Sequence, residues 1–114
     1  MKPIIFGVVA LFLLNVTTSS LAGDLTVEQY QKTRDDPRIK SYLSGVGQGI
    51  HFANIELKRE GKPRLYCPPD ELLLNVGNIY QMIDATLESN PTLPKTTFVT
   101  AIVLLKLQQT FPCK

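Results

Sequence analysis

The two cysteines of this chain each stand next to a proline, and this pair constrains the fold more than any other feature. Cys67 precedes Pro68 just before one amphipathic segment, and Cys113 follows Pro112 at the end of the next one. Two consecutive helices joined by a short turn bring the start of the first beside the end of the second. A disulfide needs Cα atoms about 4.4 to 6.8 Å apart, which such ends can supply. We therefore predict a Cys67–Cys113 disulfide that closes a C-terminal helical hairpin.

The N-terminus has the form of a secretory signal peptide, which supports this pairing. A positively charged start, an apolar run over residues 4–14 and small residues at 20–22 follow the usual order of such signals. We expect residues 1–22 to be removed and residues 23–114 to form one exported domain. Paired cysteines in an oxidising compartment favour a disulfide over a metal site or a nucleophile. The apolar run is shorter than the roughly 20 residues of a membrane span, so we expect no membrane segment in the mature chain.

Apolar periodicity and helix-start signals predict an all-α fold of four helices. The expected helices are a short one opening at 24–26, a second from 37 to about 60, a third from 70 to about 89, and a fourth beginning after Thr96 or Thr97 and stopped by Pro112. Asp36 before Pro37 is a typical helix start, and Gly61 is a natural left-handed cap for the second helix. The inner stripe expected for the second helix is Ile39, Leu43, Val46, Ile50, Ala53 and Leu57.

Two helices carry unusual residue patterns. The second contains Gly45, Gly47 and Gly49, which predict a kink or a close helix crossing because glycine lets another backbone approach. A phosphate-binding loop does not fit, since such loops have a further glycine and a preceding strand. The fourth helix is apolar on nearly every face, which predicts either a central position or a surface shared with a second molecule.

The charges and the rarer side chains give no indication of an enzyme. Twelve Lys and Arg residues are interleaved with ten Asp and Glu residues, so no basic stripe points to nucleic acid. His51 is the only histidine, and one His with two Cys does not make a four-ligand zinc site. A Cys67–His51 nucleophile pair would need a free thiol in an exported protein. We expect no catalytic, cofactor-binding or metal-binding residues.

Several short motifs resemble the pattern of the Rap/Tai immunity proteins, which are antidotes to type VI secretion peptidoglycan amidases. The resemblance covers residues 42–113. The motifs are Tyr42-Leu43-Ser44-Gly45-Val46 with Gly49, Tyr66-Cys67-Pro68-Pro69, Asn90-Pro91, and Leu107 with Phe111-Pro112-Cys113. The resemblance implies a small all-helical periplasmic protein, often a homodimer, that binds an amidase effector and occludes its catalytic cleft without a cofactor.

The resemblance also directs attention to two loops as candidate partner-binding surfaces. The candidate contact residues are Arg59, Glu60, Lys62 and Arg64 before the first cysteine, and Asn90, Thr92, Leu93 and Lys95 at the tip of the hairpin. The alternative for these residues is an ordinary solvated loop. The alternative function is a periplasmic helical chaperone or stress-response binding protein that exposes the apolar fourth helix.

Overall fold

The first two helices of the described residues begin at side-chain caps, and the second of these caps was predicted from the sequence. In the computed structural model, which describes residues 24–69 and 74–114, α2 (Val27–Thr33) follows a capping box formed by Thr26 and Gln29. α3 (Pro37–Arg59) follows Asp36, whose side chain accepts a hydrogen bond from the Arg38 N–H at 2.9 Å. Gly61 ends this helix with a φ of 70°, a left-handed conformation that glycine adopts without strain. The predicted bounds of α3 are therefore confirmed.

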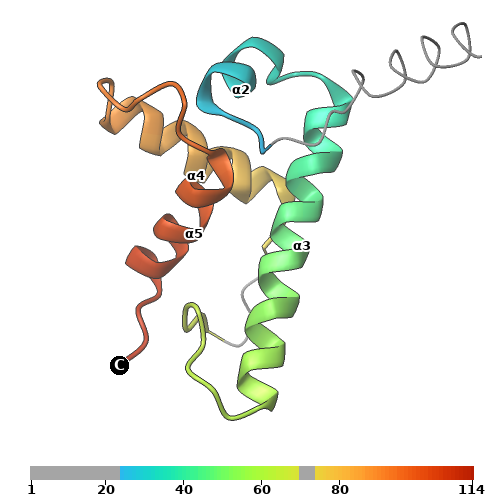
Figure 1. Cartoon of the computed structure of the whole chain (residues 1–114), viewed down its shortest axis with the longest axis vertical. Coiled ribbons are helices and arrows are strands. Elements are labelled where there is room, and N and C mark those ends of the chain that lie inside the picture. The colour runs from blue at the N-terminus through green and yellow to red at the C-terminus, as the bar shows by residue number, and fades with distance from the viewer. Residues whose placement is uncertain (1–23, 70–73) are drawn as a thin grey trace, which may run out of the picture.

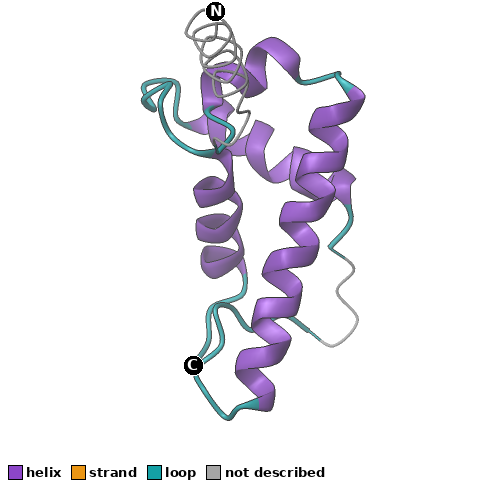
Figure 2. Ribbon diagram, turned by 45° about the vertical axis from the view of Figure 1, so that its right-hand side comes forward, coloured by secondary structure: helices purple, strands orange, loops and turns teal. Residues whose placement is uncertain are grey.

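The two remaining helices complete an all-α arrangement, as predicted. They are α4 (Val76–Ser89) and α5 (Val99–Thr110), and within the two described ranges no residue belongs to a strand (Figure 2). Figure 1 shows α4 running across the direction of α3. α5 lies on the side of α3 toward which α4 extends. No helix in the described part of the chain is long and apolar enough to cross a membrane. The predicted signal peptide, residues 1–22, lies outside the described residues.

The predicted start of the third helix is wrong. Asp70 and Glu71, expected in its first turn, lie outside the described residues, and Leu74 and Asn75 are not helical. Asn75 is extended, with φ −90° and ψ 168°, and its side chain accepts a hydrogen bond from the Asn78 N–H at 2.9 Å. This contact satisfies an N–H group that has no partner inside the helix, so α4 begins at Val76.

The start of the fourth helix also differs from the prediction. Neither threonine at 96–97 caps it, because Phe98 occupies the cap position and no side chain accepts a hydrogen bond there. The backbone of the N-terminal segment takes this role: the Val99 N–H donates to the Leu25 carbonyl at 2.9 Å. An isolated antiparallel bridge joins Thr26 to Phe98 beside it. The two segments are far apart in the chain, so the residues around the start of α5 do not predict this contact.

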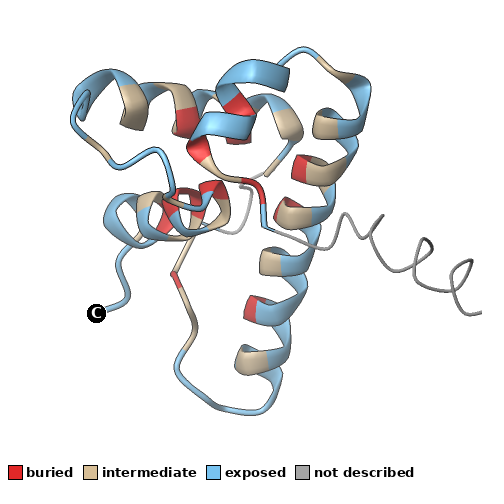
Figure 3. Cartoon of the chain, turned by 45° about the horizontal axis from the view of Figure 1, so that its top comes forward, coloured by how far each residue is buried: buried red, intermediate tan, exposed pale blue. Residues whose placement is uncertain are grey.

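The core lies where α2, α4 and α5 meet the first half of α3. Its buried apolar residues are Leu25, Val27, Tyr30, Leu43, Tyr66, Ile79, Ile83, Val99, Ile102, Val103 and Leu107. α5 buries only one side: Ala101 is exposed and Leu105 is 56% exposed. α5 therefore does not take the central position that was one of the two predictions for it, and the other, a surface shared with a second molecule, stays a prediction. α5 lies at the edge of the fold, with the core on one side and solvent on the other (Figure 3).

The buried face of α3 is rotated from the predicted stripe at its C-terminal half. Leu43 and Gly47 are buried, and the next buried position is Asn54, whereas Ala53 is exposed. Burial of an uncharged polar residue in place of a neighbouring alanine requires hydrogen-bond partners for the side chain. Those partners lie in the segment after α3 and are described below.

Of the three glycines inside α3, only Gly47 lies at a close helix contact. A Cβ atom on Gly47 would lie 2.5 Å from the Cδ1 atom of Ile79 in α4, whereas Cβ atoms on Gly45 and Gly49 would meet nothing within 4 Å. The predicted close crossing is therefore confirmed at one position. α4 packs on α3 here because Gly47 leaves room for the Ile79 side chain.

This contact gives a testable double-mutant cycle. Gly47→Ala gains about 1 kcal/mol of helix propensity, but the added methyl group displaces Ile79, and we expect the gain to be lost. Ile79→Val deletes the Cδ1 atom, so in that background Gly47→Ala is expected to be less unfavourable by about 1 kcal/mol. Urea unfolding of the four proteins measures this coupling. Additive effects of the two substitutions would contradict the assigned contact.

A polar cluster joins α2 and its C-terminal turn to α4. The Tyr30 hydroxyl donates to Asp84 at 2.6 Å, and Arg34 forms an ion pair with the same carboxylate at 2.5 Å. The Arg34 guanidinium also lies over the Tyr80 ring, 4.9 Å from its centre. Burial alone would raise the pKa of Asp84, but hydrogen bonds from Arg34 and Tyr30 outweigh it and hold this pKa below its ordinary value.

The lowered pKa of Asp84 predicts a loss of stability in acid. Asp84 in the unfolded chain binds a proton at a higher pH than Asp84 in the folded chain. The ionised carboxylate therefore stabilises the fold above about pH 4, and this stabilisation disappears as the pH falls through the pKa of the folded state. We expect Asp84→Asn to lower stability at pH 7 by about 1 kcal/mol, since the pair is partly exposed. Urea unfolding at pH 7 and pH 3 measures the difference, which should shrink at the lower pH. An equal difference at both values would rule out the ion pair as its source.

Candidate functional site

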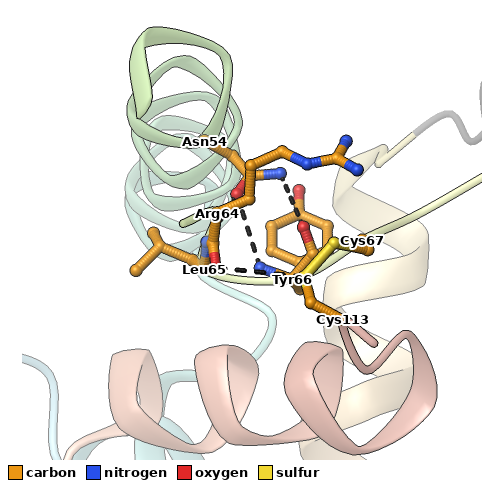
Figure 4. The surroundings of a disulfide bond; sticks show 6 residues. All are labelled: Asn54, Arg64, Leu65, Tyr66, Cys67 and Cys113. Carbon is orange, nitrogen blue, oxygen red and sulfur yellow. Dashed lines mark hydrogen bonds between the residues drawn. A yellow bond between two sulfur atoms is a disulfide. The ribbon is translucent and has the colours of Figure 1, made fainter. Parts of the chain in front are cut away.

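The predicted disulfide is present and holds an extended segment that follows α3. The Cα atoms of Cys67 and Cys113 are 5.0 Å apart, and the Cys67 N–H donates to the Phe111 carbonyl at 2.8 Å. Because α4 begins only at Val76, the bond joins the C-terminus to this extended segment and not to the first turn of α4. Figure 4 shows this segment with Asn54 of α3 on one side and the disulfide on the other.

Asn54 of α3 fixes the other side of this segment. Its amide nitrogen donates to the Tyr66 carbonyl at 3.0 Å, and its amide oxygen accepts from the Leu65 N–H at 2.8 Å (Figure 4). A longer contact of 3.4 Å joins the same oxygen to the Tyr66 N–H. Asn54 is 5% exposed and Tyr66 is 1% exposed, and burial raises the pKa of the Tyr66 phenol. The segment is thus held by side-chain hydrogen bonds on one side and by a covalent bond on the other.

A hollow of about 190 Å³ lies between the C-terminal half of α3 and residues 64–69. Lys58 and Arg64 contribute positive charge to its wall, and Ile55, which is 46% exposed, contributes apolar surface. Within the described residues, neither Lys58 nor Arg64 forms an ion pair. The hollow therefore combines a wall held by the disulfide, an apolar side chain and two cations that form no ion pair within the described residues.

Of the first group of predicted contact residues, Arg64 alone lines this hollow, and the other three lie in the chain between the end of α3 and Arg64. Arg59 is exposed at the end of α3 and pairs with Glu56, and Glu60 pairs with Lys62 at 2.9 Å in the following turn. Arg64 is half-buried in the wall itself. These four residues form one continuous stretch that extends from the end of α3 to the disulfide.

The second group lies elsewhere. Asn90 and Thr92 are exposed, Leu93 packs partly against the core, and the Lys95 ammonium donates to the Gln31 side chain at 2.8 Å. Figure 1 places the α4–α5 loop at the opposite end of the molecule from the loop after α3. The structure therefore does not bring the two predicted groups together into one surface.

The disulfide bears on one nucleophile that was considered from the sequence. The sulfur of Cys67 is bonded to Cys113, so the Cys67–His51 nucleophile pair considered from the sequence has no thiol. His51 is exposed on α3 and meets Phe52 edge-on, with ring centres 6.0 Å apart. What remains is a fixed loop with cationic and apolar side chains, which can bind a protein by shape and charge.

Sequence reasoning missed Asn54, the residue that holds the loop in place. Its signal was available: Asn54 lies seven positions after Gly47 and eleven after Leu43, which places all three on one face of a helix. A polar residue in phase with a buried stripe predicts a buried hydrogen bond. Comparison of the chain with known protein families, curated proteins and solved structures found no match, so the Rap/Tai resemblance stays a prediction from its motifs.

Proposed function

We propose that the protein is a periplasmic immunity protein that binds a type VI secretion peptidoglycan amidase and occludes its active site. The observation that supports this most directly is the fixing of the loop after α3 on both sides, by Asn54 and by the Cys67–Cys113 bond. A loop already held in its bound shape loses little conformational entropy on binding. An inhibitor that acts by filling a cleft needs such a loop, and it needs no catalytic group.

The loop after α3 is the better candidate for the contact surface. It carries Arg64 in the wall of the hollow, where Ile55 adds exposed apolar area, and Lys62 two positions before it in the chain. Buried anchors surrounded by a charged rim are the usual source of affinity in protein interfaces. The α4–α5 loop, with Lys95 directed to Gln31, lies too far away to share the same contact.

The test measures hydrolysis of peptidoglycan by a purified amidase effector encoded in the same genome. The mature chain is expected to abolish hydrolysis at an equimolar ratio and to form a complex that elutes as one species. The charge-reversal variant Lys62→Glu, Arg64→Glu is expected to weaken inhibition by about tenfold or more. Lys95→Glu is the matched control, because it makes the same kind of change in the other loop and is expected to leave inhibition intact.

The same experiment distinguishes the alternative function. A periplasmic chaperone would suppress aggregation of unrelated unfolded proteins and would bind no amidase in particular. The exposed apolar side chains available to it are Phe52 and Ile55 on α3 and Phe98 and Leu105 beside or on α5. Aggregation suppression without amidase inhibition would replace the immunity proposal by the chaperone.

A further inference from the structure

The hollow between α3 and residues 64–69 is lined by hydrogen-bond donors and by no acidic side chain. Its lining includes Lys58, Arg64 and Tyr66, and none of the described residues around it is Asp or Glu. The Lys58 ammonium and the Arg64 guanidinium form neither an ion pair nor a hydrogen bond with any described residue. Two unpaired cations in one hollow favour the binding of an anion.

Tyr66 supplies a donor that the fold itself does not use. The residue is 1% exposed, and its hydroxyl has no hydrogen-bond partner among the residues that the structure describes. No side-chain oxygen in the same ranges is both fully buried and unpaired, so this hydroxyl opens onto the hollow that Tyr66 lines. Burial raises the pKa of the phenol, which therefore keeps its proton and can donate. Figure 4 shows the hydroxyl directed to the same side of the segment as the Arg64 guanidinium.

The size of the hollow and the apolar part of its lining restrict the anion. The volume of about 190 Å³ is below the roughly 300 to 1,000 Å³ of small-molecule pockets, so it admits a single side chain. Ile55, Pro68 and Leu74 line the hollow together with the donors. Such apolar surface suits the hydrocarbon stem of an acidic side chain, which inorganic phosphate lacks. A planar guanidinium can also donate to both oxygens of a carboxylate at once.

We propose that this hollow binds one carboxylate, supplied by an Asp or Glu side chain of a protein partner. Arg64 and Lys58 neutralise the carboxylate, and the Tyr66 hydroxyl donates to one of its oxygens. Ile55 covers its hydrocarbon stem. Asn54 and the disulfide already hold the segment that carries two of the donors, so these need little rearrangement on binding. The identity of the partner as an amidase rests on the proposed function, whereas the carboxylate site does not.

Titration of the mature chain with N-acetylglutamate amide, which carries one side-chain carboxylate, tests the site without any partner protein. Nuclear magnetic resonance follows the Arg64 Nε–H and the Tyr66 N–H. We expect saturable shifts with a millimolar dissociation constant. The neutral N-acetylglutamine amide is the matched control and is expected to cause none, and inorganic phosphate should bind about tenfold more weakly. Equal binding of the neutral amide or of phosphate would overturn the assignment to a carboxylate.

Substitutions in the hollow connect the binding to its donors. Tyr66→Phe and Arg64→Gln are each expected to raise the dissociation constant of N-acetylglutamate amide about tenfold. Tyr66→Phe should leave the free energy of unfolding unchanged, because no hydrogen bond within the chain is lost. Lys40→Gln, at an exposed lysine of the same helix outside this hollow, is the control and should leave probe binding unchanged. Unchanged probe affinity in both hollow variants would overturn the site, and a less stable Tyr66→Phe variant would contradict the unpaired hydroxyl.

Inhibition of the amidase separates this inference from the proposed function. Tyr66→Phe is expected to raise the concentration needed for half-maximal inhibition about tenfold. If the chain inhibits the amidase but binds no probe and is unaffected by Tyr66→Phe, the carboxylate site is wrong and the proposed function stands. If the probe binds and no amidase is inhibited, the immunity function is wrong and the site stands. Micromolar binding of the free probe, with inhibition unchanged in Tyr66→Phe, would identify a free acid as the ligand and overturn the protein source.

Discussion

Removing the disulfide by Cys67→Ala and Cys113→Ala is expected to lower the free energy of unfolding by about 4 kcal/mol. The two cysteines are 46 positions apart, and cross-linking a loop of that length removes much of the conformational freedom of the unfolded chain. The domain is small, and domains of this kind have total stabilities of about 5 to 15 kcal/mol. We therefore expect a substantial fraction of the variant to be unfolded under conditions in which the wild-type protein is fully folded.

Urea unfolding monitored by circular dichroism measures this loss. Wild-type protein treated with a reductant serves as the control, because reduction breaks the same bond without changing the side chains at 67 and 113 by more than a proton. The reduced protein and the double variant are expected to unfold at similar urea concentrations. A difference of less than about 1 kcal/mol between oxidised and reduced protein would show that the bond contributes little beyond the contacts already present.

The parts of the fold that the sequence predicts are those set by neighbouring residues. The start of α3 at Asp36 and Pro37 and its end at Gly61 follow from local hydrogen bonding and backbone preference, and both are confirmed. The disulfide was also predictable, because two cysteines allow one pairing within the chain and the predicted signal peptide favours their oxidation. The outcome is a correct fold class and correct bounds for α3, the longest helix in the described part of the chain.

The parts that sequence reasoning missed depend on contacts between distant segments. α5 begins where it does because Val99 donates to the Leu25 carbonyl, and no threonine near 97 has a comparable effect. Similarly, the backbone at 65–66 determines which residue near the end of α3 is buried. It hydrogen-bonds to Asn54, so Asn54 is buried and Ala53 is exposed. The apolar periodicity predicted that Ala53 is buried, because Ala53 is apolar and Asn54 is polar.

The candidate site shows the same division. Arg59, Glu60, Lys62 and Arg64 lie within six consecutive positions, so their closeness in space follows from the chain itself. The distance between them and the loop at 90–95 depends on how α4 crosses α3, and that crossing depends on the fit of Ile79 over Gly47. The sequence pattern predicts where the helices are but not the angles at which they cross. It therefore cannot predict how far apart the two loops lie.

The second large effect is expected at Asn54. Asn54→Leu keeps the size of the side chain but leaves the Leu65 N–H and the Tyr66 carbonyl without their partners at a buried position. Each unpaired buried group costs about 1 to 3 kcal/mol, so we expect the free energy of unfolding to fall by about 3 kcal/mol. Gln81→Leu, an exposed change of the same type on α4, is the control and should stay within about 0.5 kcal/mol.

Asn54→Asp distinguishes the hydrogen bond that the amide accepts from the one that it donates. The carboxylate can still accept from Leu65 but repels the Tyr66 carbonyl, and burial favours its protonated form. Protonation supplies a donor for that carbonyl, so the variant is expected to gain stability relative to wild type as pH falls from 7 to 4. Hydrogen exchange at the Leu65 N–H, compared with urea unfolding at both pH values, distinguishes a locally released loop from global destabilisation. If Asn54→Asp and Asn54→Leu behave alike at every pH, the hydrogen bond to Tyr66 is not what holds the loop, and shape alone fixes it against α3.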